Sequence, residues 1–207
     1  MIFNDRQDAG RRLAEKLVKN KTKTSVVYGL PRGGVITAKE IAKALNLPLD
    51  LIIGRKIGHP LNPEYAIGAI SENGEIVGSA ELAEVDPEWL KQKRGEEMRE
   101  AKRRHDFYLI GREPIKAKGK IAIIVDDGIA TGWTMLAAVK QVKSQIPRKI
   151  IVAVPVASSE AVERLKKEAD EVVVLEPPET FLDAVGAYYS DFHQVSDEEV
   201  LKTLLDQ

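Results

Sequence analysis

The sequence predicts an α/β fold, a single domain built on a mostly parallel, doubly wound sheet. Short apolar runs rich in β-branched residues alternate with segments whose apolar positions recur at helical spacing. These runs contain almost no polar residues, which is typical of strands buried on both faces of a parallel sheet. With 207 residues, the chain is long enough for one domain with a full core, and we expect no second independent domain.

Composition excludes several classes of function. A formal net charge of -1 provides no general attraction for nucleic acid or for anionic membranes. The absence of cysteine excludes disulfides and thiolate sites, and no apolar run approaches the roughly 18 residues of a membrane span. The first residues contain no apolar signal-peptide region. We therefore expect a cytoplasmic protein whose partners are small molecules and not nucleic acid or membrane.

The first expected elements are an amphipathic helix over residues 5–19, a buried strand over 25–30 and a helix over 35–45. Between that strand and the second helix lies the loop Pro31-Arg32-Gly33-Gly34. Its glycines give flexible backbone with exposed N–H groups, and its guanidinium is suited to phosphate oxygens. Taken alone, a Gly-Gly turn is equally an ordinary connection from strand to helix.

A second buried strand is expected over residues 49–53, and three potentially cationic side chains follow it: Arg55, Lys56 and His59. Ligands of parallel sheets bind at the carboxyl ends of the strands. We therefore expect these side chains to face the same crevice as Arg32 and the two Asp residues that follow the central strand. For His59, an ordinary exposed loop residue is an equal alternative.

Residues 57–80 are expected to form a lid hairpin. Its mobile part is the segment 58–63, the chain returns as a strand over 65–71, and an Asn-Gly turn leads into a strand over 76–78. An inserted charged helix over residues 87–110 follows, with Asp86 as its N-cap. Acids interleave with its basic residues, which favours a solvated helix over a nucleic-acid surface.

The central stretch contains the strongest chemical signal. A buried strand over residues 121–125 ends in Asp126 and Asp127, a small-residue loop follows, and a helix covers 134–142. Such a loop directs free N–H groups and the positive end of a helix dipole at its contents, which suits a phosphate. The two acids would repel that phosphate, so they should face sugar hydroxyls or a divalent cation.

The remaining elements are a strand over 149–156, a helix that starts at Ser158 or Ser159, and a strand over 171–175. Residues 177–207 are expected to form a hood or base-side segment, with a last helix over 197–206. This segment contains a group of aromatic residues, among them Tyr188, Tyr189 and Phe192. Their rings could stack a planar base, or they could fill a core or a dimer contact.

The stretch Val125–Thr134, which reads VDDGIATGWT, resembles the phosphoribosyl pyrophosphate (PRPP) motif of type I phosphoribosyltransferases. That motif is an apolar strand, two acids, two usually apolar residues and a small-Thr-Gly-x-Thr loop. Gly128 and Trp133 depart from it, and a Trp here must turn its ring away from the ligand or form one wall of the site. A response-regulator acid pocket also places paired Asp residues after a strand, but it uses the first strand of the fold.

The resemblance implies transfer of a 5-phosphoribosyl group from PRPP to a nitrogen acceptor, expected to be a nucleobase, with Mg²⁺ as cofactor and a homodimer as the assembly. Asp126 and Asp127 would hold the ribose hydroxyls and, directly or through water, the metal, and Lys56 would join them as a catalytic residue. The expected 5′-phosphate residues are Ala130, Thr131, Gly132, Trp133 and Thr134. The expected pyrophosphate residues are Pro31, Arg32, Gly33, Gly34, Arg55, Lys56 and His59.

Two questions about function stay open at this point. A non-catalytic sensor of PRPP or of a nucleotide would use the same pocket, although the cationic pair Arg55-Lys56 favours chemistry. The acceptor is not identified by any motif. In hypoxanthine-guanine phosphoribosyltransferases an acid precedes the loop Thr and works on the purine ring, whereas this sequence has Ala130 there.

Overall fold

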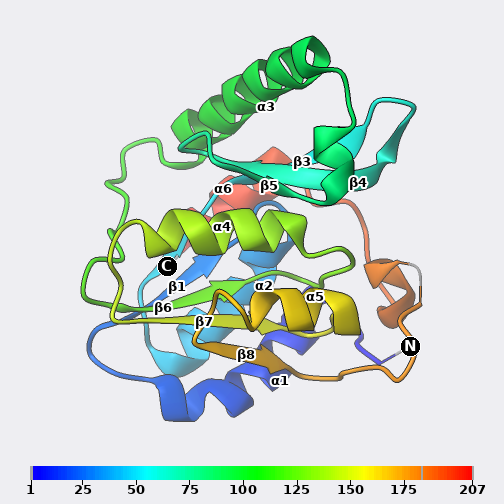
Figure 1. The fold of residues 1–207 in the computed structure, drawn as a ribbon. Helices are drawn as coiled ribbons and strands as arrows, with labels where there is room; N and C mark the ends of the chain where they lie inside the picture. Colours follow the sequence, from blue (N-terminus) through cyan, green and yellow to red (C-terminus); the bar gives the residue numbers. More distant parts are fainter. Residues whose placement is uncertain (1, 183, 207) are drawn as a thin grey trace.

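The computed structural model describes residues 2–182 and 184–206. Figure 1 shows stacked layers, with a large sheet between two sets of helices and a smaller sheet beneath a long helix. The elements are α1 (Arg6–Leu17), β1 (Ser25–Gly29), α2 (Gly33–Leu45), β2 (Leu49–Leu51), β3 (Gly54–His59), β4 (Asn62–Ser71), β5 (Ile76–Gly78), α3 (Pro87–Tyr108), β6 (Ile121–Val125), α4 (Trp133–Lys143), β7 (Lys149–Val154), α5 (Ser159–Leu165), β8 (Glu171–Val174) and α6 (Asp197–Leu205). Short 3₁₀ turns cover Val18–Asn20, Ala80–Ala83 and Val185–Tyr188.

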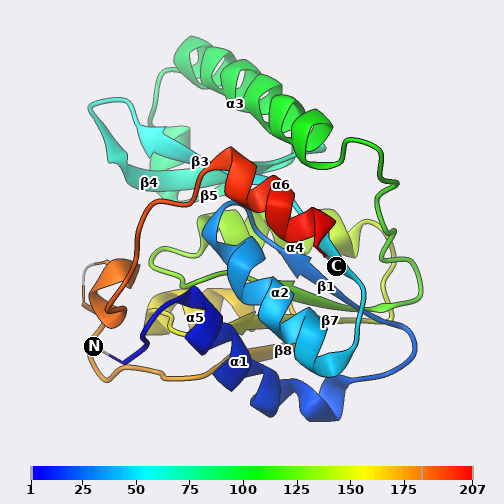
Figure 2. The same cartoon turned by 180° about the vertical axis from the view of Figure 1, so that it is seen from behind.

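The main sheet has five strands in the order β2-β1-β6-β7-β8, and every pairing in it is parallel. Helices α4 and α5 cover one face (Figure 1), and α1 and α2 cover the other (Figure 2). Strands β1 and β6 are buried at every position because both of their faces pack against helices. The doubly wound parallel sheet predicted from the sequence is therefore confirmed.

The hairpin region forms a second, antiparallel sheet in the order β3-β4-β5. It lies between α3 and α4 and has its own apolar cluster, centred on Ile57, Ile67 and Ile70. The sequence prediction was wrong about the strand before it, because β2 ends at Leu51 and the chain enters β3 at Gly54. The cationic residues after it therefore belong to a strand of this second sheet and not to a loop after a parallel strand.

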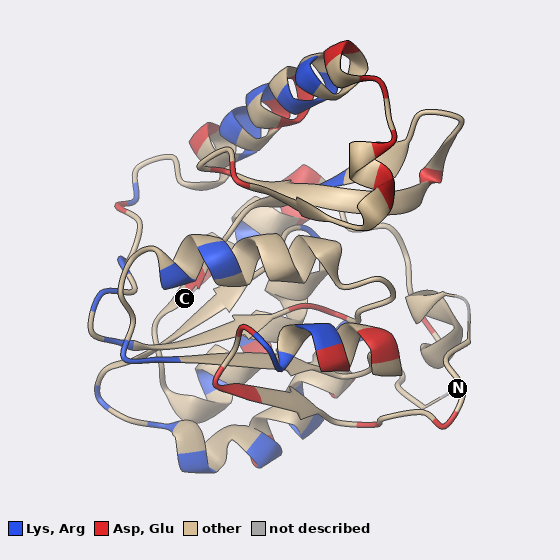
Figure 3. Ribbon diagram, in the orientation of Figure 1, with Lys and Arg blue, Asp and Glu red and all other residues tan. Residues whose placement is uncertain are grey.

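Helix α3 is the charged helix expected from the sequence, capped by the side chain of Asp86, which accepts a hydrogen bond from the Trp89 N–H. Basic and acidic residues interleave along it (Figure 3). Its last turn packs beside α6, where Asp197 accepts hydrogen bonds from the Tyr108 hydroxyl at 2.7 Å and from Arg103 at 2.9 Å. Within the described residues, no helix is long and apolar enough to cross a membrane.

The segment before α6 runs alongside the start of the chain. Phe3 forms a parallel β-bridge with Tyr189, and their rings lie 5.2 Å apart. Backbone hydrogen bonds join Ser190 to Phe3 and Asp191 to Asn4. The Tyr189 hydroxyl also donates to the carbonyl of Asp127, which follows β6, so this segment reaches the edge at which the parallel strands end.

Candidate functional site

Two loops that are far apart in sequence meet at the carboxyl ends of β1 and β6. A Cβ atom added to Gly33 would clash with the Asp127 carboxylate, and one added to Gly34 would lie 2.8 Å from that of Asp126. The absence of side chains at these two positions therefore lets the loop after β1 approach the acids after β6. The structure brings together the glycine loop and the acidic pair, as the sequence predicted.

Hydrogen bonds from other groups of the protein fix the two carboxylates of the acidic pair. Asp126 accepts a hydrogen bond from the Asp127 N–H at 2.8 Å, and Asp127 accepts one from Arg6 Nε at 2.6 Å. Burial and the neighbouring Asp127 charge raise the pKa of Asp126 well above its usual range. Burial also raises the pKa of Asp127, and the Arg6 guanidinium acts against that rise. Arg6 therefore favours the ionised form of Asp127.

Hydrogen bonds to two of its backbone carbonyls fix the loop Ala130–Thr134. The Ser158 hydroxyl donates to the Ala130 carbonyl at 2.6 Å, and an Arg164 nitrogen donates to the Thr131 carbonyl. Gly132 has φ +79° as the N-cap of α4, a conformation that favours glycine. Helix α4 begins at Trp133, and the first N–H groups of a helix have no partners within it. The loop thus presents free donors at the positive end of a helix dipole.

The ring of Trp133 is turned away from the loop, which is the first of the two arrangements predicted from the sequence. The Arg164 guanidinium stacks over the ring at 3.8 Å from its centroid, and the ring packs against the core between α4 and the sheet. The indole is therefore turned towards α5. This arrangement leaves the backbone of Trp133 as its contribution to the loop.

Arg32 is the N-cap residue of α2 and leans towards α6. Its Nη1 atom lies 3.8 Å from the Asp197 carboxylate, and its side chain is 29% exposed. Pro31 precedes it in a cis peptide bond. A pair at 3.8 Å contributes little, so the guanidinium stays available to an anion at the loop.

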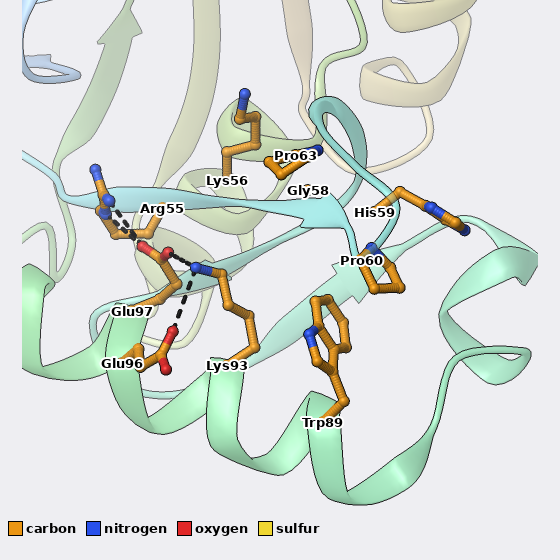
Figure 4. Close-up of a pocket in the computed structure, with 10 residues that line it drawn as sticks. All are labelled: Arg55, Lys56, Gly58, His59, Pro60, Pro63, Trp89, Lys93, Glu96 and Glu97. Atoms are coloured by element: carbon orange, nitrogen blue, oxygen red, sulfur yellow. Dashed lines mark hydrogen bonds and ion pairs between the residues drawn. The ribbon is translucent and has the colours of Figure 1, made fainter.

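Arg55 and Lys56 point to opposite faces of β3 (Figure 4), so the prediction that both face the crevice of Arg32 and the acidic pair was wrong for Arg55. Successive side chains alternate along a strand. A Cβ added to Gly54 would lie 2.8 Å from Thr134 of α4, which places Lys56 on the α4 side. Arg55 lies on the α3 side, where Glu97 accepts a hydrogen bond from its Nε at 2.8 Å and pairs with its Nη2 at 2.7 Å.

Lys56 is the more accessible of these two cations. Its side chain is 42% exposed, and the carboxylate that it pairs with, Glu64 at 3.2 Å, is itself 93% exposed. Such a pair is weak in water, and a pyrophosphate can displace it. Of the two cations, Lys56 is therefore the candidate for a ligand on the phosphate-loop side.

His59 ends β3, and its Nδ1 atom accepts a hydrogen bond from the Leu61 N–H at 3.2 Å. This bond stabilises the hairpin turn, so the structure favours an ordinary loop residue over a direct role in chemistry. A hollow of about 320 Å³ lies between this turn and α3, with Trp89 and Pro60 among its walls (Figure 4).

The prediction that Tyr188 and Tyr189 stack a base is corrected by their burial, since the two residues are 3% and 2% exposed. Tyr188 accepts a hydrogen bond from the Leu182 N–H at 2.7 Å, and the Tyr189 hydroxyl donates to the Asp127 carbonyl. Phe192 is half-buried, and its ring lies under the Arg6 guanidinium at 3.8 Å. These aromatic residues pack in or against the core, and Tyr189 and Phe192 also contact the acidic pair through Asp127 and Arg6.

Sequence reasoning missed three residues that shape the site: Arg6, Arg164 and Glu97. Each is a charged residue on a helix, where a charge is usually solvated. The partner of Arg6 lies 121 positions away. Local sequence contained one usable signal, for Ser158, which is both the N-cap of α5 and a donor to the loop.

Comparisons with known proteins identify the family of this chain. The family model described as the phosphoribosyl transferase domain matches residues 2–191. The Mycobacterium tuberculosis H37Rv protein named "Putative phosphoribosyl transferase Rv0571c" is 43% identical over 209 residues, which cover 98% of this chain and 46% of that protein. The chain thus spans about half the length of the curated relatives that it matches.

Solved structures show the same fold. The crystal structure of TT1426 from Thermus thermophilus matches with a TM-score of 0.83 and 46% identity, over 100% of this chain and 99% of that one. AQ2163 from Aquifex aeolicus matches with a TM-score of 0.52 at 16% identity, over 86% of this chain and 77% of that one, and shows the fold alone. Because the family model matches residues 2–191, which is nearly the whole sequence, and the fold agrees, this chain belongs to the phosphoribosyl transferase domain family.

Proposed function

We propose that this protein transfers the 5-phosphoribosyl group of PRPP to a nitrogen acceptor, a nucleobase, and releases pyrophosphate. The observation that carries the proposal is the contact of Gly33 and Gly34 with the two carboxylates. The glycine loop and the loop Ala130–Thr134 would then supply N–H donors on either side of the two acids, which would bind the sugar. An anion site, a sugar site and a second anion site in this order would suit the 5′-phosphate, ribose and pyrophosphate of PRPP.

Each part of the substrate has a candidate partner. The loop Ala130–Thr134 and the start of α4 would hold the 5′-phosphate through N–H groups and the Thr hydroxyls. Asp126 and Asp127 would accept hydrogen bonds from the ribose hydroxyls. Arg32, Lys56 and the first turn of α2 would neutralise the pyrophosphate.

In the reaction, a lone pair of the acceptor nitrogen forms a bond to ribose C1 while the bond from C1 to the pyrophosphate oxygen breaks. The proton that the free base carries is lost to solvent. The electron pair of the broken bond leaves with the pyrophosphate, so negative charge grows there and positive charge grows on the ribose ring. Lys56 and Arg32 would stabilise the first charge, and Asp126 and Asp127 the second. The β3–β4 hairpin would exclude water from C1.

The acidic pair supplies only some of the oxygen ligands that a divalent cation requires. Carboxylate oxygens are suitable ligands for Mg²⁺, but within 2–182 and 184–206 no group of three or more carboxylates and imidazoles is gathered around one point. Asp126 and Asp127 would therefore hold the ion, directly or through water, together with substrate oxygens. When bound, Mg²⁺ neutralises the charge of the leaving pyrophosphate.

The acceptor site is proposed only by class. Tyr188 and Tyr189 offer no exposed face, so a base would have to stack elsewhere along residues 177–207 or under the hairpin. A homodimer and a cytoplasmic location stay predictions from the sequence.

The test is incubation of the protein with PRPP, Mg²⁺ and a panel of nucleobases, with release of pyrophosphate as the readout. We expect release that depends on one class of base and that is abolished in the double variant Asp126→Asn/Asp127→Asn. The same variant should lose affinity for PRPP in calorimetry while keeping its circular dichroism spectrum. Binding of PRPP without turnover on any base would instead support a sensor, and wild-type affinity in the double variant would refute the site.

A further inference from the structure

Arg6 makes a set of contacts that the proposed reaction does not require. Its Nε atom donates to Asp127 at 2.6 Å, its Nη1 atom donates to the His193 carbonyl at 2.8 Å, and its guanidinium lies over the Phe192 ring at 3.8 Å. The residue is only 7% exposed. Three partners from two distant segments therefore fix this one side chain.

Arg6 also lies directly at the glycine loop. A Cβ added to Gly33 would lie 2.6 Å from Arg6 Nε, as well as against Asp127. The guanidinium thus lies beside the Asp127 carboxylate, in space that a side chain at position 33 would enter.

The charge of this cluster has a consequence for metal binding. Two adjacent carboxylates would attract a divalent cation, and a buried guanidinium bound to one of them opposes that attraction. A carboxylate has about four lone-pair sites, so the bond from Arg6 still leaves Asp127 able to accept from a hydroxyl. The arrangement therefore suits a sugar better than a bare metal ion.

We propose that Arg6 is a positioning residue of the ribose site, which fixes the Asp127 carboxylate towards a sugar hydroxyl and prevents the ligand-free site from binding a divalent cation. The proposal rests on the proposed function for the identity of the sugar. It implies that the metal binds together with the pyrophosphate, because the pyrophosphate oxygens supply the metal ligands that the protein lacks. Charge and position are separate properties of Arg6, and substitutions can separate them.

The experiment compares the wild type with Arg6→Gln, Arg6→Lys and the matched control Arg11→Gln. Arg11 lies on the same helix, is 57% exposed, and reaches Glu40 only at 3.8 Å. The first probe is Mn²⁺ alone, with the free ion measured by electron paramagnetic resonance. The second probe is ribose 5-phosphate without metal, measured by calorimetry, and circular dichroism confirms the fold of each variant.

We expect Arg6→Gln to bind Mn²⁺ about tenfold more tightly than the wild type, which corresponds to the loss of one opposing charge worth about 1.4 kcal/mol. Arg6→Lys keeps the charge and should bind Mn²⁺ as weakly as the wild type. Both variants should bind ribose 5-phosphate at least about tenfold more weakly, because neither Gln nor Lys can make the three contacts of the guanidinium. Arg11→Gln should match the wild type with both probes.

Unchanged Mn²⁺ affinity in Arg6→Gln overturns the charge part of the proposal, and wild-type affinity of Arg6→Lys for ribose 5-phosphate overturns the positioning part. If Arg6→Gln does not fold, the double variant Arg6→Gln/Asp127→Asn is compared with Asp127→Asn, and tighter Mn²⁺ binding in the double variant is expected because the opposing charge of Arg6 is then the only difference. A wild type that binds neither ribose 5-phosphate nor PRPP would refute the proposed function, while the Mn²⁺ comparison would still decide the role of Arg6.

Discussion

The opposite orientations of Arg55 and Lys56 lead to opposite predictions for two neighbouring alanine variants. Arg55→Ala removes the main partner of Glu97, whose side chain is 9% exposed, and leaves this carboxylate paired with Lys93 at 2.8 Å. Lys56→Ala removes a surface cation whose ion pair with Glu64 is exposed to water. The first variant should therefore lose stability, and the second should lose affinity for a pyrophosphate.

The expected magnitudes follow from these contacts. Removing one partner of a buried ion pair costs about 3–5 kcal/mol, and because Lys93 remains beside Glu97 we expect the lower end for Arg55→Ala, about 3 kcal/mol. In a domain of this size that corresponds to a fall in melting temperature of about 6–12 °C. Lys56→Ala should change stability by less than about 0.5 kcal/mol. A charged hydrogen bond to pyrophosphate contributes about 1.5–3 kcal/mol, so its loss should weaken PRPP binding about 10- to 150-fold.

Urea unfolding measures the first effect, and calorimetry with PRPP and with ribose 5-phosphate measures the second. Lys56→Ala should weaken PRPP and spare ribose 5-phosphate, which has no pyrophosphate. The reasoning is refuted if Arg55→Ala keeps its stability and loses PRPP affinity as Lys56→Ala does, or if Lys56→Ala weakens both ligands equally.

Three further predictions concern the rest of the molecule. Tyr189→Phe keeps the ring but leaves the Asp127 carbonyl without its donor, so urea unfolding should show a loss of about 1–3 kcal/mol, and an unchanged midpoint would contradict this role. Hydrogen bonds from Lys149 and Lys19 lower the pKa of Glu171 to about 2 from 4.5. Because the folded-state pKa is the lower one, this carboxylate stabilises the protein above about pH 4.5 and loses that effect as the pH falls towards 2. Glu171→Gln should therefore show a smaller loss of stability across that range, and an identical acid profile would argue against the ion pairs. Hypoxanthine and guanine should be poor acceptors because Ala130 cannot exchange a proton with the purine ring. Rapid pyrophosphate release with hypoxanthine would disprove this.

Much of the fold could be predicted because its main strands are buried on both faces. The predicted strand over 121–125 matches β6 in full, since an apolar run between a glycine-containing turn and two acids allows one interpretation. The predicted first residues of two helices, 87 and 197, also agree with the structure, because the preceding residues Asp86 and Ser196 cap these helices. The strand before β3 was predicted two residues too long, because Ile52 and Ile53 are apolar and buried but lie in the connection between two sheets.

The candidate site was predictable only where its residues are contiguous in sequence. The glycine loop and the acidic pair belong to short motifs at strand ends, and their meeting follows from the parallel sheet. The sides of Arg55 and Lys56 depend on strand β3, whose glycines and charged residues resemble a loop in the sequence. Arg6 and the buried tyrosines depend on contacts between the two ends of the chain, which no local pattern describes.

The separate apolar cluster of the β3–β5 sheet changes the thermodynamics expected of lid closure. Ordering a flexible loop costs conformational entropy of about 1–2 kcal/mol for every residue that becomes fixed. Residues 54–78 are already paired in a sheet and packed under α3, so closure of this unit as a rigid body would order few additional residues. Amide hydrogens of β4 should accordingly exchange slowly even without ligand, and the heat capacity change on PRPP binding should reflect buried surface with little contribution from folding.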